Sequence, residues 1–212
     1  MKIKTFVFNH FGENTYVVYD ESTRICAIID PGCFFNQEKQ ELKNFIVNEN
    51  LQVDSVLFTH CHLDHAFGAN FMAMEFPQVK ICAHRNEQIF IDEAIDQSLR
   101  FGINMEQPPQ ITNPIADGDI VHIGNVELRA IFTPGHSPGG MCFYNAEQGI
   151  LFSGDVLFQN SIGRTDLPGG NYNTLIESIT KKLLCLPDET IVYCGHGGTT
   201  TIKNERETNP FF

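Results

Sequence analysis

Basic residues are scarce in this sequence of 212 residues, where 14 Lys and Arg face 26 Asp and Glu, giving a formal net charge of −12. A surface with that excess of negative charge repels the phosphates of nucleic acids and the headgroups of anionic lipids. We therefore expect a small-molecule substrate, with neither nucleic acid nor a membrane as a partner.

Long hydrophobic runs are also missing. No stretch approaches the about 18 apolar residues that a membrane-spanning helix requires. Near the N-terminus, Asn9, His10, Gly12 and Asn14 interrupt the apolar pattern before the core of a signal peptide could form. These two absences predict a cytoplasmic protein.

The seven cysteines include no CxxC pair, and their number is odd. Most of them lie inside apolar runs, for example ICAIID at residues 25–30. Reduced and mostly buried thiols are the simplest interpretation.

Short apolar runs rich in β-branched residues recur along the chain. They predict strands at residues 2–8, 15–19, 25–29, 54–59, 79–83, 119–123, 126–133, 141–144, 150–153 and 190–194. Apolar residues at helical spacing predict helices over 37–47, 86–101 and 173–184. This order favours an α/β fold of four layers (αββα), two mixed sheets packed face to face with helices outside. No linker interrupts the pattern, so one domain is expected over residues 1–212.

One segment, VLFTHCHLDH, runs from an apolar strand directly into four groups able to bind a metal: His60, His62, Asp64 and His65. His60 and His62 lie two apart on extended backbone and therefore point the same way. Asp64 and His65 follow where the chain turns. One loop can thus offer two imidazoles to one cation, and a carboxylate with an imidazole to another.

Three later strands each end at a glycine beside a further candidate ligand: His136, Asp155 and His196. Glycine permits tight turns, and strand ends present side chains to a common cleft. The set then holds five imidazoles and two carboxylates, enough for two metal ions. Without metal, burying so many polar groups would carry a large desolvation cost.

At these residues the sequence resembles the metallo-β-lactamase superfamily. The H-x-H-x-D-H signature appears as HCHLDH at residues 60–65, and GHSPGG (135–140), FSGD (152–155) and CGHGG (194–198) follow in the family's order. Within the superfamily the chain looks most like the small glyoxalase II-like (hydroxyacylglutathione hydrolase-like) hydrolases. They share the loop SIGRTDLPGG at 161–170 and an ending like NERETNPFF at 204–212.

The resemblance implies a dinuclear metal centre. One ion would be held by His60, His62 and His136, the other by Asp64, His65 and His196, with Asp155 bridging them. Asp64 and Asp155 are also predicted to be catalytic. The expected cofactors are two zinc ions, although iron or manganese would suit imidazole and carboxylate ligands too. Full-length glyoxalase II resembles this chain plus a C-terminal helical domain that helps to hold glutathione, a domain we do not expect here.

Two cations sharing a water would lower its pKa from about 15.7 towards about 7, producing a hydroxide that attacks a substrate carbonyl. A thiolate, with a free pKa of about 8.5, can leave without a dedicated acid, whereas the nitrogen of an amide or lactam must be protonated. The predicted function is therefore hydrolysis of small thioesters. Asp155 stands where the best-known β-lactamases of the superfamily have a cysteine ligand, which disfavours antibiotic hydrolysis.

Two rival functions remain open. The first is a persulfide dioxygenase with one non-haem iron, for which the ligands would be His60, His136 and Asp155. The second is a binding module in which metal only holds the fold together. Structural zinc sites usually close four ligands around each ion, whereas this set leaves positions open.

Three residues outside the ligand set have two interpretations each. Asp30, in IDPG, either accepts an N–H from a ligand imidazole or forms a turn. Arg164 either contacts an anionic part of the substrate or pairs with Asp166 on the same loop. Cys61 points away from its histidine neighbours and is expected to be a packed thiol. Local structural roles are expected for the isolated histidines: His10, His84 and His122.

Overall fold

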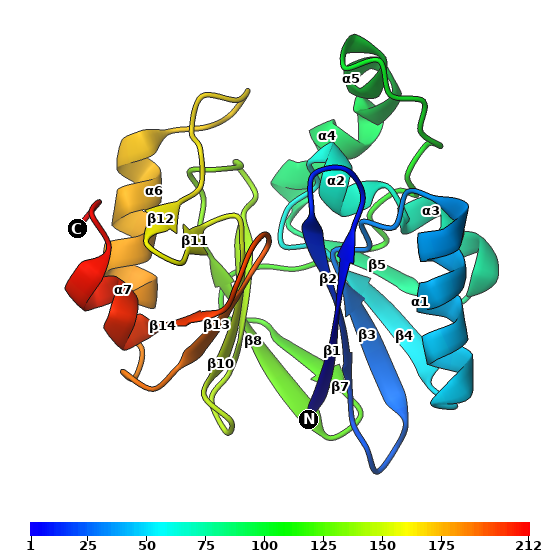
Figure 1. Ribbon diagram of the computed structural model, residues 1–212, viewed down its shortest axis with the longest axis horizontal. Coiled ribbons are helices and arrows are strands. Elements are labelled where there is room, and N and C mark those ends of the chain that lie inside the picture. The colour runs from blue at the N-terminus through cyan, green and yellow to red at the C-terminus, as the bar shows by residue number, and fades with distance from the viewer.

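Two mixed β-sheets pack face to face, and helices cover the outer face of each (Figure 1). This computed structural model describes residues 1–212. The four-layer αββα fold predicted from the sequence is confirmed. None of its helices combines the length and apolar character needed to cross a membrane.

The first sheet has the strand order β1-β2-β3-β4-β5-β6. Its first three strands are antiparallel, and the strands from β3 to β6 run parallel to one another. Parallel neighbours need long crossovers, which α1 (Asn36–Asn48), α2 (Leu63–Ala66) and α3 (Ala69–Glu75) supply. The strands are β1 (Lys2–Phe8), β2 (Glu13–Tyr19), β3 (Ile25–Ile29), β4 (Gln52–Leu57), β5 (Lys80–Ala83) and β6 (Asn113–Pro114).

The second sheet has the order β14-β13-β10-β9-β8-β7, in which only β10 and β13 are parallel neighbours. Its strands are β7 (Ile120–Ile123), β8 (Val126–Phe132), β9 (Met141–Asn145), β10 (Ile150–Gly154), β13 (Ile191–Cys194) and β14 (Thr200–Thr201). A small hairpin joins β11 (Leu157–Phe158) to β12 (Ser161–Ile162). The helices beside this sheet are α6 (Tyr172–Ser178), the π-helical η2 (Ile179–Leu183) and α7 (Ile202–Thr208).

Alternate positions along the strands divide the core into layers. Ile28 packs outwards with Leu42 of α1 and Met72 of α3, whereas its neighbours Ala27 and Ile29 face the second sheet. This alternation follows from the two-residue period of a strand. A third layer fills the space between the second sheet and α6, η2 and α7.

The helix predicted over residues 86–101 is wrong as a single element. The chain there forms a 3₁₀ turn, η1 (Arg85–Glu87), followed by α4 (Gln88–Asp92) and α5 (Ala94–Arg100). Leu99, which the helical pattern assigned to the buried face, is 60% exposed. Phe90 and Ile91 are the buried residues of α4, and Ala94 and Ser98 are those of α5. Glu87, at the end of η1, is fully buried.

The predicted helix over 173–184 likewise changes character partway. Its first half is α6, and its second half is the π-helical η2. Short elements that the apolar pattern did not signal are α3, α7, β6, β11, β12 and β14.

Truncating Leu42 should destabilise the protein strongly. This side chain is fully buried between α1 and the first sheet, so Leu42→Ala should lower the free energy of unfolding by about 2–5 kcal/mol. Val47 on the same helix is 58% exposed. Val47→Ala should therefore change the free energy of unfolding by no more than about 0.5 kcal/mol. Equilibrium urea unfolding measures both, and equal losses would contradict the assignment of the buried face.

Candidate metal centre

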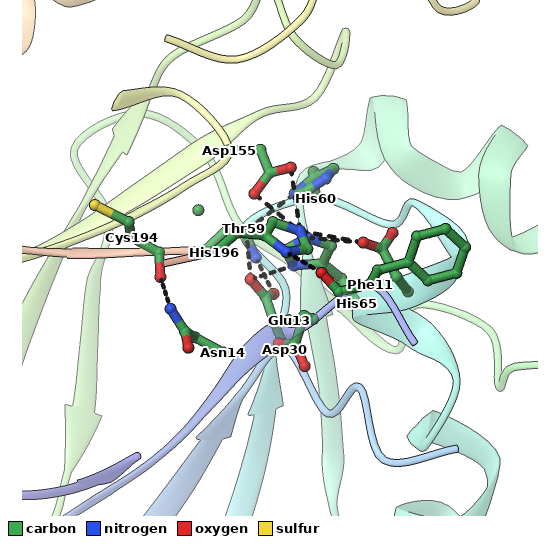
Figure 2. Close-up of polar contacts among 12 residues, drawn as sticks. Phe11, Glu13, Asn14, Asp30, Thr59, His60, His65, Asp155, Cys194 and His196 are labelled. Carbon is green, nitrogen blue, oxygen red and sulfur yellow. Dashed lines mark hydrogen bonds and ion pairs between the residues drawn. The ribbon is translucent and has the colours of Figure 1, made fainter. Parts of the chain in front are cut away.

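The seven predicted metal ligands lie at one edge of the sandwich, and those labelled in Figure 2 point towards one another. Each follows the carboxyl end of a strand: β4 leads to the cluster that starts at His60, β8 to His136, β10 to Asp155 and β13 to His196. Rigid strands from both sheets therefore position the ligands, although the ligands themselves stand on loops.

The donor atoms form two groups, and within each group they lie within 4.8 Å of one another. Asp155 lies between the groups. Its Oδ2 is 3.7 Å from Nε2 of His136 and 3.6 Å from Nε2 of His196, and its Oδ1 is 3.4 Å from Nε2 of His65. The first group is His60, His62 and His136, and the second is Asp64, His65 and His196.

Backbone carbonyls orient two of the imidazoles. Nδ1 of His136 lies 2.8 Å from the carbonyl oxygen of Arg164, and Nδ1 of His196 lies 3.2 Å from that of Phe11. A carbonyl oxygen can only accept, so each Nδ1 must carry the proton and donate it. The lone pair of each neutral ring is then on Nε2, which faces the other ligands.

A series of hydrogen bonds between side chains orients two more imidazoles. Nδ1 of His65 lies 3.0 Å from Oδ2 of Asp30, and the hydroxyl of Thr59 donates to the same oxygen at 2.5 Å. Because Thr59 has given its only proton to Asp30, its oxygen accepts from Nδ1 of His60 at 3.1 Å. His60 and His65 therefore also turn Nε2 towards the centre.

Several atoms of this cluster have no partner within the protein. Nε2 of His62, Nε2 of His65 and Oδ1 of Asp155 are buried without a hydrogen bond. In the first group, Nε2 of His60 and Nε2 of His136 face each other at 3.2 Å. A cation between such lone pairs removes the cost of burying them unpaired, so these residues fit metal ions.

Asp30 also lies close to His60 and His65, which suggests a third possible group. Its oxygens are already in use, since Oδ1 accepts the backbone N–H of Thr59 at 2.7 Å and Oδ2 takes the two donors above. We therefore interpret Asp30 as a support for His65, one of the two roles that the sequence allowed. Its φ of 49° lies in the left-handed region, which Asp tolerates better than most residues.

The first group is electrically neutral without metal. Burial lowers the pKa of His60, and the neighbouring histidines lower it further. Burial and His136 lower the pKa of His62 to about 3. Burial also lowers the pKa of His136, against the opposing effect of Asp155. These imidazoles are thus already in the form that binds a metal.

The second group is charged. Burial would lower the pKa of His65, but Asp155 and Asp64 outweigh it and raise that pKa. Burial would also lower the pKa of His196, but its hydrogen bond to Asp64 and the charge of Asp155 outweigh burial and raise that pKa. Asp64 and Asp155 have lowered pKa values because the nearby histidines outweigh burial. The carboxylates of Asp64 and Asp155 therefore favour protonation of His65 and His196.

Residues that were not predicted from the sequence hold the His196 loop. The amide of Asn14 donates to the carbonyl oxygens of Cys194 at 3.0 Å and Gly197 at 2.9 Å, and the hydroxyl of Tyr16 also donates to Cys194. The available signal was a run of polar residues, Glu13 to Thr15, at the start of a strand that is buried on both faces.

A glycine allows the same loop to approach the centre. A Cβ added at Gly195 would lie 2.1 Å from Oδ1 of Asp155 and 3.0 Å from Cε1 of His65. Contacts this short force something to move, so only glycine fits between the two ligands at this position.

The other predicted residues lie outside both groups. Arg164 pairs with Asp166 through two hydrogen bonds of 2.7 and 2.8 Å, and both side chains are exposed. Cys61 is buried in the core of the first sheet. None of the isolated histidines belongs to a ligand group: His10, His84 and His122.

Metal binding by the second group should release protons and strengthen as the pH rises. The pKa values of His65 and His196 lie above the ordinary value of about 6.5, so metal must displace protons there. The first group is already neutral and should bind with little dependence on pH between about 6 and 8. Titration calorimetry in buffers of different ionisation enthalpy measures this release. Proton release by neither ion would contradict the charge assignment.

Comparisons with known proteins identify the family. The sequence profile of the metallo-beta-lactamase superfamily matches residues 9–196. Hydroxyacylglutathione hydrolase GloC of Haemophilus influenzae is 37% identical over 215 residues, covering 100% of this chain and 98% of that protein. The structure of BLEG-1 B3 metallo-beta-lactamase has 35% identity and a TM-score of 0.90 over 99% of both chains. TTHA1623, solved in a di-iron-bound form, has 32% identity and a TM-score of 0.86 over 100% of both chains. The chain therefore belongs to the metallo-β-lactamase superfamily.

Proposed function

We propose that this protein hydrolyses small thioesters in the cytoplasm, using two metal ions, most simply zinc. The observation that carries the proposal is the pair of adjoining ligand groups with Asp155 between them. Metal ions bound there would supply activated water at neutral pH and polarise a substrate carbonyl. A di-iron form of a similar protein supports iron as the alternative metal.

The chain's own residues prepare the site by fixing where lone pairs and charges lie. The carbonyl oxygens of Arg164 and Phe11 hold the rings of His136 and His196 with Nε2 inwards. Asp64 and Asp155 offer negative charge to metal ions, since the nearby histidines lower the pKa values of both carboxyl groups. This orientation before substrate arrives is what makes an electrostatic site effective.

A thioester fits these groups because its leaving thiolate is stable near neutral pH, with a free pKa of about 8.5. Departure then needs no proton donor. The name of the relative GloC, a hydroxyacylglutathione hydrolase, points to the same class of substrate. The name of BLEG-1 points instead to β-lactams, so both classes belong in one screen.

An apolar pocket lies beside the second ligand group and offers a place for the apolar part of a substrate. Its volume is about 220 Å³, and its aromatic lining is Phe11, Phe34 and Phe67. Phe11 joins the pocket to the centre because its carbonyl oxygen holds His196. Asn9, which also lines the pocket, donates to the backbone oxygen of Asp64 at 3.0 Å.

Metal analysis combined with a substrate screen tests the proposed function. We expect two metal ions per chain and hydrolysis of glutathione or coenzyme A thioesters in preference to lactams and phosphodiesters. His62→Ala should keep the fold, lose one metal and lose more activity than the about 10–100-fold that an outer-shell change costs. His122→Ala is the matched control, since His122 is exposed on β7 and ligates nothing.

Other outcomes would replace the proposal. One iron per chain with oxidation of a persulfide would favour a mononuclear dioxygenase built on His60, His136 and Asp155. The second group argues against it, because Asp64, His65 and His196 would then have no role. Unfolding on metal removal would favour a purely structural metal.

The pocket predicts a selective effect on apolar substrates. Phe34→Ala should lower kcat/KM for thioesters with a bulky apolar group by about 10-fold, mainly through KM, because it removes buried contact area. Short acyl substrates should change little. Phe101→Ala is the control, since that ring is 68% exposed and lies outside the pocket lining. Equal losses for short and bulky substrates would show that the pocket does not bind substrate.

A further inference from the structure

Glu87 is a fully buried glutamate surrounded by hydrogen-bond donors. Its Oε2 accepts the backbone N–H of Cys61 at 2.7 Å. Its Oε1 accepts the backbone N–H of Gly139 at 2.7 Å and the hydroxyl of Ser137. Hydrogen bonds to a carboxylate are among the strong ones in proteins, and a buried group that loses them is costly.

The donors belong to the two loops that carry the first ligand group. Cys61 stands between His60 and His62, and Ser137 directly follows His136. The two oxygens of the Glu87 carboxylate therefore tie together two loops that are far apart in the sequence, since His60 and His136 are 76 residues apart. Glu87 belongs to neither loop, since it lies on η1.

Two further contacts link Glu87 and the helix that follows it to the first ligand group. A Cβ added at Gly139 would lie 2.6 Å from Oε1 of Glu87, so the loop can approach the carboxylate only because glycine stands there. Phe90, one turn further along the same segment, packs its ring 5.0 Å from that of His62. Neither contact reaches the second ligand group.

We propose that Glu87 is a positioning residue for the first metal: it sets the distance between the loop of His60 and His62 and the loop of His136. It is not itself a ligand, because it belongs to no ligand group. The second group has separate supports, Asp30 for His65 and the Phe11 carbonyl for His196. Removing Glu87 therefore weakens one metal site and spares the other. This role rests on the dinuclear site of the proposed function, but not on its substrate.

Glu87→Gln is the sharpest test. The variant keeps the shape, but its NH₂ must face a donor on one of the two loops, so one of the loops loses its tie. We expect one of two bound zinc ions to bind about 10–100-fold more weakly, the usual cost of losing an outer-shell partner. Zinc affinities are measured by competition with a chromophoric chelator, and the visible spectrum of the cobalt-substituted protein should change at one site only.

Glu205→Gln is the matched control. Glu205 is equally buried. Its carboxylate oxygens accept hydrogen bonds from the backbone N–H of Asn160 at 2.9 Å and from the side-chain amides of Asn209 at 2.7 Å and Asn204 at 2.8 Å. It ties α7 to the β11–β12 turn and to Thr200, where β14 begins, and it contacts neither loop of the first ligand group. This variant should lose stability comparably, yet keep both zinc affinities.

Ser137→Ala keeps the test decisive if Glu87→Gln does not fold. It removes one donor and leaves the two backbone donors, so the same zinc site should weaken, by less than about 10-fold. Unchanged zinc affinities, an equal loss at both sites, or the same loss in Glu205→Gln would overturn the proposal. If one zinc site weakens as expected but no thioester is hydrolysed, the proposed function fails and the role of Glu87 stands.

Discussion

The constraint on which the structure depends is the burial of imidazole nitrogens that face one another. Nε2 of His60 lies 3.2 Å from Nε2 of His136, and Nε2 atoms of His62 and His65 are buried without partners. The geometry therefore depends on what holds the rings from behind. Four of the five rings are held by oxygens that take the Nδ1 proton, those of Thr59, Asp30, Arg164 and Phe11.

The supporting oxygens explain why both sheets are needed. Thr59 and Asp30 follow strands β4 and β3 of the first sheet, whereas the His196 loop follows β13 of the second. Asn14, on β2, donates across to the carbonyl of Cys194 at the end of β13. The edge where the sheets meet is thus closed by the same hydrogen bonds that aim the ligands, so sheet packing and metal geometry are set together.

The sequence pointed to the candidate ligands more clearly than to the residues that hold them. His60 to His65 lie within one short loop, and the later candidates follow strand ends marked by glycine, so local patterns together with the family resemblance were enough to propose them. Glu87 lies in the polar stretch HRNEQ, which reads as the exposed start of a helix. In the structure it ends η1 and is fully buried among donors from two distant loops, and such long-range contacts leave no local pattern in the sequence. The prediction of one helix over 86–101 likewise rested on local spacing alone.

The two ligand groups also differ in how strongly they hold protons, and this bears on how each would take up a metal. Burial lowers the pKa values of the first group, so its imidazoles offer lone pairs without losing a proton. In the second group Asp64 and Asp155 raise the pKa values of His65 and His196, so metal competes with protons there. Structural zinc sites are typically built with cysteine thiolates, whereas neither group contains a cysteine. The donor set therefore favours metals that serve chemistry over metals that serve only the architecture.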